Sequence, residues 1–299
     1  MTTLPGSLVT PLKRGADQPA WLQMLRHAAR RSPVGVVSLC ILCIILLSTV
    51  FADVISPRSP QETSMAARFA SPSAEYVFGA DNLGRDVYAR VLYGGRPILL
   101  TGFASVFIAL GIGLAIGTIA GYRGGWVDNL LMRLMDVMLS FPSVLLAILI
   151  VATLGRGLSN LIIAIGFAMV PVFARLVRSV VLSLLHEEYV TAARSLGAVD
   201  GQIIRWHLLP NIIAPIIVQA SGLLAVAIST AAALNYIGLG IQPPDPDWGV
   251  MVADGQKMLY DAPHVPLYPG IAITLTVLSI NFVGDMLRDT LDPKLRRSE

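Results

Sequence analysis

Long stretches without a single charged residue constrain this sequence more than any other feature. Six of them are long enough to form membrane helices, which need about 20 apolar residues to cross the hydrocarbon core. They lie at residues 34–52, 97–122, 137–155, 157–174, 208–244 and 265–284. Only 14% of the 299 residues are charged, against roughly 25% in soluble domains. The pattern predicts an all-α membrane protein with six transmembrane helices.

The stretch at 208–244 is too long for one straight span. We expect a helix over residues 211–236, followed by a turn rich in Gly and Pro at the membrane surface. Pro142 and Pro171 lie inside predicted spans and are expected to kink them, because proline lacks the backbone N–H that a helix needs.

Glycines recur every four residues in the second span, at Gly113, Gly117 and Gly121, with Gly102 nearer its start. Such a stripe lets another helix backbone approach closely. Ordinary packing between membrane helices is sufficient to explain it. A helix packed tightly beside a translocation path is the alternative.

The polar segments divide the chain around these spans. Residues 34–52 are interpreted as a retained anchor, because the basic leader and the apolar run are long; a signal peptide cleaved after Ala52 is the alternative. The predicted divisions are a cytoplasmic N-terminal segment (1–33), a first transmembrane anchor (34–55), an extracytoplasmic connector (56–96), a five-helix core (97–291) with a cytoplasmic loop at 184–210, and a cytoplasmic tail (292–299).

The distribution of Lys and Arg predicts the orientation. With six spans, both termini lie on one side, and together with the loops after Tyr122 and Ala174 they hold 15 of the 22 Lys and Arg residues. Positive residues accumulate on the cytoplasmic side of a membrane. Both termini are therefore expected in the cytoplasm, with the protein in the inner membrane. Five arginines in the connector at 56–96 weaken this bias.

Several function classes are excluded by what the sequence lacks. Lys and Arg are spread along the loops without an aromatic-flanked patch, so no nucleic-acid partner is expected. The four histidines are far apart and no catalytic motif occurs, so neither a metal site nor an enzyme is predicted. None of the three lysines follows a glycine as in a phosphate-binding loop, so the chain itself is not expected to hydrolyse ATP. Cys40 and Cys43 lie in an apolar run, where packing is expected rather than redox chemistry.

A short cytoplasmic segment, residues 187–197, carries the clearest functional pattern. Its acidic residues come first and Gly197 comes last, as in a helix with favourable ends. Four residues at helical spacing form a mostly small apolar face: Tyr189, Ala192, Ala193 and Leu196. That face fits the groove of a partner protein, but a helix lying on the bilayer has the same spacing.

The same segment resembles the EAA loop of ATP-binding-cassette (ABC) importer permeases. Order, spacing and location between two spans all agree for Glu188, Ala192, Ala193, Arg194 and Gly197, followed by Ile204, Leu209, Pro210 and Asn211. In that family this loop forms the coupling helix that docks on the nucleotide-binding subunit. The resemblance implies that Glu188 fixes the helix start, that Ala192 and Ala193 make the close contact, and that Gly197 turns the chain. Pro210 is expected to punctuate the return to the membrane.

Three further segments are similar to the dipeptide/oligopeptide/nickel permease family, most closely to its C-type subunits in dipeptide and glutathione importers. The first contains Gly79, Asp81, Gly84, Arg85, Asp86 and Arg90. The second contains Gly238, Gly240, Pro244 and Trp248. The third contains Asn281, Gly284, Asp285, Arg288, Asp289, Asp292 and Pro293.

The roles of these segments stay open at this stage. The first is either a self-paired structural turn or a docking surface for a binding protein. In the third, Asp285 and Arg288 are spaced to pair on one helix face, which favours an interfacial anchor over a solute site. The resemblance covers nearly everything after residue 30.

The resemblance implies a type I ABC importer (MetI-like) permease fold that works by alternating access. The chain would pair with a homologous second permease, two ATP-binding subunits that use the ATP, and an extracytoplasmic solute-binding protein. It would contact membrane lipid and bind no cofactor itself. The implied solutes are di- or oligopeptides, glutathione or nickel chelates, among which the sequence does not choose.

Polar residues of the fifth span are candidates for lining the translocation path, because polar groups within a span usually face protein or water. They are Gln219, Ser221, Ser229, Thr230 and Asn235. Ordinary hydrogen bonds between helices are the alternative for most of them. A passive membrane channel or a scaffold is the alternative function, although a channel has no use for an ATPase-docking segment.

Overall fold

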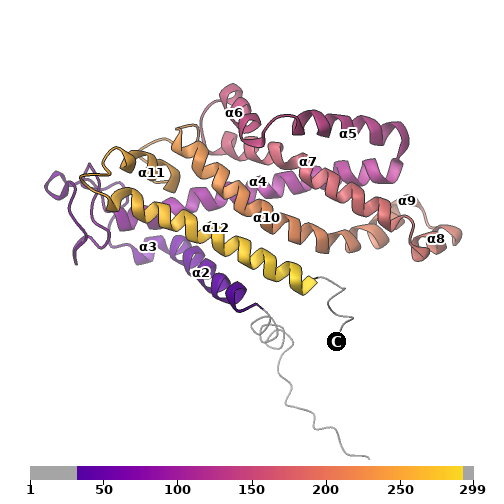
Figure 1. The fold of residues 1–299 in the computed structure, drawn as a ribbon, viewed down its shortest axis with the longest axis horizontal. Helices are drawn as coiled ribbons and strands as arrows, with labels where there is room; N and C mark the ends of the chain where they lie inside the picture. Colours follow the sequence, from indigo (N-terminus) through magenta and orange to yellow (C-terminus); the bar gives the residue numbers. More distant parts are fainter. Residues whose placement is uncertain (1–31, 292–299) are drawn as a thin grey trace, which may run out of the picture.

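The computed structural model describes residues 32–291 of the chain and shows an elongated bundle whose long helices run side by side (Figure 1). Residues 1–31 and 292–299 lie outside the described part. The predictions for most of the N-terminal segment, for the tail, and for Asp292 and Pro293 therefore have no structural counterpart here.

The two ends of the bundle carry different short elements. The helices α8 (Glu188–Ser195) and α9 (Asp200–Gln202) lie at one end, and α3 (Ala52–Ile55) and α11 (Trp248–Gln256) lie at the other (Figure 1). A short 3-10 helix, η1 (Met65–Ala67), belongs to the connector at the α3 end.

Five helices of the described part are long and apolar enough to cross a membrane. They are α2 (Pro33–Val50), α4 (Val87–Arg123), α7 (Leu158–Leu184), the continuous helix Asp200–Tyr236 that ends in α10 (Leu209–Tyr236), and α12 (His264–Leu291). A sixth crossing results if the bent pair α5 (Gly125–Leu139) and α6 (Ser143–Leu154) counts as one span. The prediction of an all-α protein with six membrane-crossing units is thus confirmed.

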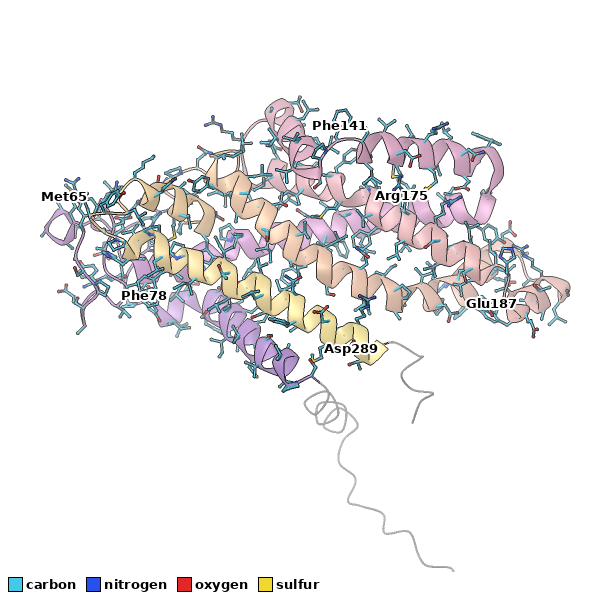
Figure 2. The ribbon with its side chains drawn as sticks, in the orientation of Figure 1. Met65, Phe78, Phe141, Arg175, Glu187 and Asp289 are labelled. Carbon is cyan, nitrogen blue, oxygen red and sulfur yellow. The ribbon has the colours of Figure 1, made fainter. Side chains whose placement is uncertain are left out.

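The third predicted span, residues 137–155, is interrupted at the proline where a kink is expected. Residues 137–155 begin in the last turn of α5, pass a bend of 89° and continue in α6. Pro142 precedes α6 with an extended backbone (ψ 130°) and has no N–H with which to continue α5. Phe141 marks this bend in Figure 2. The kink expected at Pro142 is therefore a complete break between two helices.

Two transmembrane helices extend well past the uncharged stretches that predicted them. The helix α4 begins at Val87 rather than at residue 97, because the Asp86 carboxylate accepts a hydrogen bond from Tyr88 N (2.9 Å) and caps it there. The helix α7 passes through Pro171 and continues beyond Ala174 to Leu184. Charged residues in these extensions do not end the helices, since they are paired.

Two ion pairs join α7 to α5. The Arg178 guanidinium donates to both carboxylate oxygens of Asp128, each at 2.5 Å, and Asp128 is buried. Arg175 donates to Asp136 at 2.5 Å, with both side chains about half exposed (Arg175 is labelled in Figure 2). These pairs hold α5 against α7. They also neutralise charged residues that, from the sequence alone, would be placed outside the membrane.

The glycine stripe of α4 packs against the backbone of α7. A Cβ atom on Gly113 would lie 2.5 Å from Phe173 Cβ, and one on Gly117 would lie 2.5 Å from Ala174 O. The stripe therefore serves close helix packing, as small residues do between membrane helices. Gly102 instead faces Ile228 of α10, at 2.5 Å from its Cγ1.

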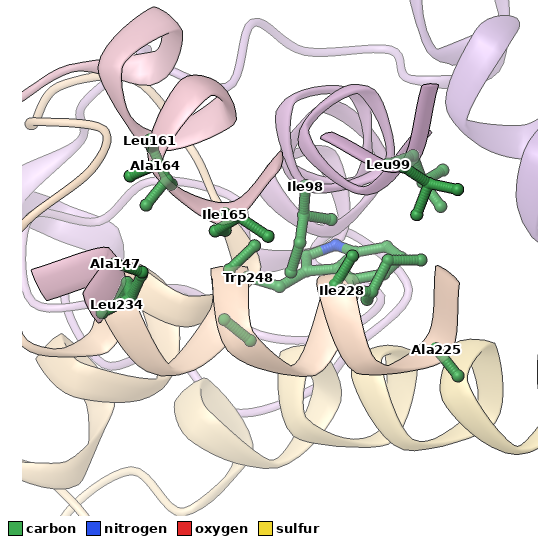
Figure 3. Close-up of a cluster of buried hydrophobic side chains, with 14 of the residues drawn as sticks. Ile98, Leu99, Ala147, Leu161, Ala164, Ile165, Ala225, Ile228, Leu234 and Trp248 are labelled. Atoms are coloured by element: carbon green, nitrogen blue, oxygen red, sulfur yellow. The ribbon is translucent and has the colours of Figure 1, made fainter. Parts of the chain in front are cut away.

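Trp248 lies in the centre of the main hydrophobic core (Figure 3). It is the largest fully buried side chain of the described residues, and Figure 3 shows it among Ile98 of α4, Ile165 of α7 and Ile228 of α10. Its indole N–H donates to Val91 O at 2.7 Å. Because Trp248 opens α11, this contact fixes the second connector, residues 245–264 between α10 and α12, onto the transmembrane helices.

Candidate functional site

The helix α8 projects from one end of the bundle and has one buried residue, Val190. Val190 is fully buried and packs in a cluster with Val181 of α7, Ile203 and Ile212. Figure 2 labels Glu187, the residue before α8, at this end of the molecule. The helix is therefore anchored on the membrane helices while most of its own surface stays free.

The face of α8 on which the sequence predicts docking is exposed. Tyr189 is 41% exposed and Leu196 is 89% exposed, while Ala192 is exposed and Ala193 is half-buried. Apolar side chains gain no free energy from contact with water. An apolar face on an anchored, projecting helix therefore marks an interaction surface. Glu188 is the first residue of α8, where a carboxylate is favoured by the positive end of the helix.

A hydrogen-bonded turn ends α8 at Gly197. Gly197 N donates to Arg194 O (2.9 Å) and Ala198 N donates to Ala193 O (3.0 Å), the pair of bonds that defines a Schellman motif. Gly197 has φ +85°, a conformation in which a side chain is strained. No atom lies within 4 Å of a Cβ added there, so the backbone, and not lack of space, requires glycine.

One aromatic side chain ties α8 and α9 to the transmembrane helix α4. The Arg194 guanidinium lies over the Tyr122 ring, 5.6 Å from its centroid, and Tyr122 Oη donates to Asp200 Oδ1 at 2.5 Å. Tyr122 is the second-last residue of α4. Sequence reasoning missed Tyr122 and Asp200, because only the tertiary structure brings them to the segment at 187–197.

A second set of contacts ties α8 to the start of α10. The Tyr189 and His207 rings are 6.0 Å apart between centroids. Asn211 Nδ2 donates to His207 O (2.7 Å) and, at 3.5 Å, to Tyr189 Oη. A displacement of α8 would therefore act directly on the helix that carries the candidate path residues.

The chain enters α10 without a break. Ile203–Leu208 is wound as a π-helix, and Ile204 packs partly buried against the Val190 cluster. Leu209 and Pro210 then open α10, where a proline in the first turn is tolerated. The expected interruption at Pro210 is thus wrong, since the helix is continuous from Asp200 to Tyr236.

At the opposite end, the first family segment forms a self-paired turn. Asp81 Oδ1 accepts from Leu83 N (2.9 Å) and Arg85 N (3.0 Å), and Asp81 Oδ2 accepts from Arg85 Nε (2.7 Å). Arg90 Nε lies 3.7 Å from the same Oδ2. Asp81, Arg85 and Arg90 are all buried, which favours the structural alternative over an open docking surface.

The two connectors at this end, residues 56–96 and 245–264, are joined through this turn. Arg90 Nη1 donates to Pro60 O (3.0 Å) and to Pro244 O (3.4 Å), while Gln61 donates to Asp245 (2.8 Å). Close packing at Gly79 and Gly84 accompanies these contacts: an added Cβ would meet the His264 ring at 2.5 Å and Ser64 O at 1.7 Å, respectively.

The second connector contains a buried carboxyl group. Asp247 Oδ1 accepts from Gly249 N (2.8 Å) and Val250 N (3.4 Å) and caps α11. Its Oδ2 atom has no hydrogen-bond partner among the described residues. Burial raises the pKa of Asp247 from its usual 3.8 to about 7, although both backbone bonds oppose this shift.

Gly238, with φ +76°, ends α10 before this connector, and Gly240 packs against Asn235.

Three of the candidate path residues lie in the C-terminal half of α10, and their side chains differ in exposure. Asn235 is fully buried and its Oδ1 accepts from Ile241 N (3.0 Å), so it holds the turn after α10 and does not line an open path, contrary to the prediction. Ser229 is exposed and Thr230 half-buried. The Ser229 hydroxyl donates to Ala225 O (2.9 Å) within its own helix.

Gln219 and Ser221 lie beside the third family segment. Together with Asn281, Gly284, Asp285 and Arg288 they line an open pocket between α10 and α12. The expected pairing of Asp285 with Arg288 is wrong, since no ion pair joins them in the part of the chain that the structure describes. Asp289 is exposed near the end of α12 (Figure 2).

Among residues 32–291 no group of His, Cys, Asp and Glu is arranged to hold a metal ion. What the site offers is a mechanical arrangement. An exposed short helix is anchored at Val190 and is connected to α4 through Tyr122 and to α10 through Asn211. Such an arrangement connects the exposed α8 directly to two transmembrane helices.

Comparison with known proteins agrees with this arrangement. Residues 113–297 match the family described as binding-protein-dependent transport system inner membrane component. Residues 20–72 match the N-terminal transmembrane domain of oligopeptide transport permease C.

Individual relatives cover nearly the whole chain. A dipeptide transport system permease protein of Alkalihalophilus pseudofirmus is 47% identical over 89% of this chain and 88% of its own length. A glutathione transport system permease protein of Pectobacterium atrosepticum is 40% identical over 92% of both chains. A putative peptide transport system permease protein of Brucella abortus is 43% identical over 92% of this chain and 90% of its own.

Two solved structures share the fold. A chain of the inward-facing MetNI methionine ABC transporter superposes with a TM-score of 0.54 at 20% identity, over 68% of this chain and 96% of that chain. A chain of an amino acid ABC transporter superposes with a TM-score of 0.52 at 16% identity, over 67% and 94% of the two chains.

The fold and the anchored, projecting α8 define a membrane permease of the MetI-like type, which works in transport and not as an enzyme. The chain belongs to the family of binding-protein-dependent transport system inner membrane components and is a permease subunit of an ABC importer.

Proposed function

We propose that this permease forms half of the translocation path for small peptides, and that α8 docks on a separate ATP-binding subunit. The anchored yet exposed α8 is the observation that supports the docking role. The identity of 47% to a dipeptide permease and of 40% to a glutathione permease supports the peptide class of solute.

The complete importer contains this chain, a homologous second permease, two ATP-binding subunits and an extracytoplasmic solute-binding protein. Both termini and α8 face the cytoplasm, and the end with α3 and α11 faces outward in the inner membrane. When ATP closes the two ATP-binding subunits, α8 moves with them. The contacts of Tyr122 and Asn211 carry this movement to α4 and α10, and the path opens outward.

Substitution of the docking face tests this proposal. In Ala193→Glu a charge must be buried at the contact with the ATP-binding subunit, which costs far more than an exposed charge does. ATP-driven uptake should be abolished and co-purification of the ATP-binding subunits strongly reduced, while the permease still reaches the membrane.

Thr191→Glu is the matched control. Thr191 is an exposed residue of the same helix and points away from the face that holds Tyr189 and Ala193, given the helical angle of about 100° per residue. The importer with Thr191→Glu should retain ATP-driven uptake. Normal uptake by the Ala193→Glu importer, or recovery of this chain alone from gently solubilised membranes, would contradict the docking role and favour a passive channel or a scaffold.

A further inference from the structure

An open pocket between α10 and α12, which we call the α10–α12 notch, is unusually polar for a position between two transmembrane helices. It has a volume of about 200 Å³. Its walls are Val218, Gln219, Ser221 and Gly222 of α10 and Asn281, Gly284, Asp285 and Arg288 of α12. The sequence had assigned these two sets to different roles, a path lining and an interfacial anchor.

Two glycines shape the notch. At Gly284 a Cβ atom would lie 2.7 Å from Ser221 Oγ, so the two helices touch there and close one side. At Gly222 no atom lies within 4 Å of an added Cβ, so the other side stays open. The space is therefore an open notch, closed at Gly284 and accessible at Gly222.

The charged groups of the notch have no partner in the described chain. Asp285 and Arg288 are both exposed, one helical turn apart, and no described residue forms an ion pair with either of them. In contrast, Arg90, Arg175 and Arg178 on the other transmembrane helices are all paired. Charges at membrane depth are costly unless they are paired or face water.

Two amide side chains add hydrogen-bonding capacity. Asn281 Nδ2 donates to Val277 O (3.0 Å), which leaves its carbonyl oxygen free to accept. The Gln219 side chain lines the same cavity and takes part in no side-chain hydrogen bond among residues 32–291. The notch thus offers one anionic group, one cationic group and neutral amides within a single small space.

We propose that the α10–α12 notch binds the charged termini of a zwitterionic peptide on its way through the permease. The ammonium group of the solute lies at the Asp285 carboxylate and its carboxylate at the Arg288 guanidinium, where charge-assisted hydrogen bonds replace the missing partners. This assignment rests on the proposed peptide-import function and adds a binding site to it.

The size of the notch agrees with a short solute. Its volume of about 200 Å³ equals several times the roughly 30 Å³ that one water occupies, but lies below the roughly 300–1,000 Å³ of ordinary ligand pockets. A weak site that contacts only part of the solute suits a transport path, because the solute must also leave.

Protection of an introduced cysteine tests the proposal in the complete importer. Gly222→Cys places a thiol at the open mouth, in a background with Cys40→Ala and Cys43→Ala, and a neutral maleimide reports its accessibility. Alanyl-alanine should slow the labelling in a concentration-dependent manner. Asn281→Cys on the other wall is the second reporter if Gly222→Cys does not assemble.

Charge variants then test which groups bind. Asp285→Asn and Arg288→Gln should each raise the alanyl-alanine concentration for half-protection by about tenfold or more, the factor for losing one hydrogen bond to a charged group. Asp289→Asn, a neighbouring exposed acid outside the notch, should leave it unchanged. N-acetyl-alanyl-alanine amide, which lacks both charges, should protect poorly.

The outcomes separate this inference from the function on which it rests. If the importer takes up alanyl-alanine with ATP but the dipeptide gives no protection, or protects no better than the blocked peptide, the notch is not a solute site and the import function stands. If labelling is already blocked without peptide, a lipid or a second subunit covers the notch, and the inference is also wrong. Failure of the parent importer to take up any peptide would overturn both.

Discussion

At the scale of single residues, positions with one geometric requirement determine where several helices begin or end. Gly197 and Gly238 both have positive φ and both close a Schellman motif, at the ends of α8 and α10. Asp86 and Asp247 cap the starts of α4 and α11. These four residues set where a membrane helix or the docking helix stops and the connecting chain begins.

Gly197→Val should weaken the docking of α8. Valine is strained at φ +85°, so the turn opens and Leu196 leaves its place on the exposed face. We expect less ATP-binding subunit to co-purify and faster hydrogen exchange of the α8 amides. Gly201→Val, an exposed position without atoms near its Cβ, is the control. Unchanged co-purification in Gly197→Val would rule out the capping role.

The buried carboxyl of Asp247 predicts a pH dependence of stability. Because its pKa is raised from 3.8 to about 7 in the folded protein, the folded state holds a proton that the unfolded state has lost between these values. The free energy of unfolding therefore falls as the pH rises from about 4 to about 7, and the contribution is lost above that range.

Asp247→Asn should remove this dependence, since asparagine still accepts the capping hydrogen bonds and does not titrate. Thermal unfolding of the purified protein would show Asp247→Asn gaining stability over the parent as the pH is raised from about 4 to about 7, with a constant difference above that range. Asp245→Asn, at an exposed neighbouring position, should keep the parent's profile. A constant difference between Asp247→Asn and the parent at all pH values would contradict the predicted titration.

At the scale of elements, α5 is held by charge as well as by packing. It faces α7 through the Asp128–Arg178 and Asp136–Arg175 pairs, while one stripe of large apolar residues stays exposed toward lipid or a partner: Trp126, Leu130, Leu134 and Val137. The break at Pro142 leaves α5 without a rigid connection to α6. The ion pairs are therefore what positions α5 against the bundle.

Arg178→Gln should destabilise the permease more than Arg175→Gln does. Loss of Arg178 leaves Asp128 buried without its partner, which we expect to cost about 1–3 kcal/mol, less than for a fully buried pair. The half-exposed Arg175–Asp136 pair should contribute less than about 1 kcal/mol. Thermal unfolding in detergent measures both. Addition of Asp128→Asn to Arg178→Gln should recover part of the lost stability. If Arg178→Gln and Arg175→Gln destabilised the permease equally, burial of an ion pair would not determine its contribution to stability.

At the scale of the whole molecule, the two ends of the bundle separate two tasks. One end carries α8, exposed and built for contact with a partner, and the other carries two connectors tied by Arg90 and Gln61. The long helices between them run from one end to the other (Figure 1). The proposed orientation places α8 in the cytoplasm and the connectors outside.

Single cysteines at the two ends test this orientation. Leu196 and Met65 are 89% and 68% exposed. Met65 is labelled at one end of the bundle in Figure 2, and Leu196 directly follows α8, which lies at the other end (Figure 1). In a background without the native cysteines, Met65→Cys should react with a membrane-impermeant maleimide in intact cells or spheroplasts. Leu196→Cys should react only after the membrane is permeabilised. The reverse pattern would invert the proposed topology.

The sequence by itself determined the class of this protein. Uncharged runs of membrane length, positive charges in the loops and the pattern from Glu188 to Gly197 identify an all-α permease with a docking segment, because hydropathy and helix-end chemistry are local properties. The restriction to local properties also explains the predictions that were wrong. Arg175 and Arg178 fall outside the predicted spans, but carboxylates 39 and 50 residues away in the sequence neutralise them inside α7.

Only the tertiary structure decided which residues act together. The burial of Asn235 and Asp247 and the contact of Tyr122 with Arg194 and Asp200 depend on neighbours that sequence spacing does not reveal. The α10–α12 notch is the clearest case: Gln219 and Asp285 belong to different motifs, and only the packing of α10 on α12 places them in one cavity. Burial and proximity are properties of the folded chain, so the environment of each polar group could not be read from its own segment.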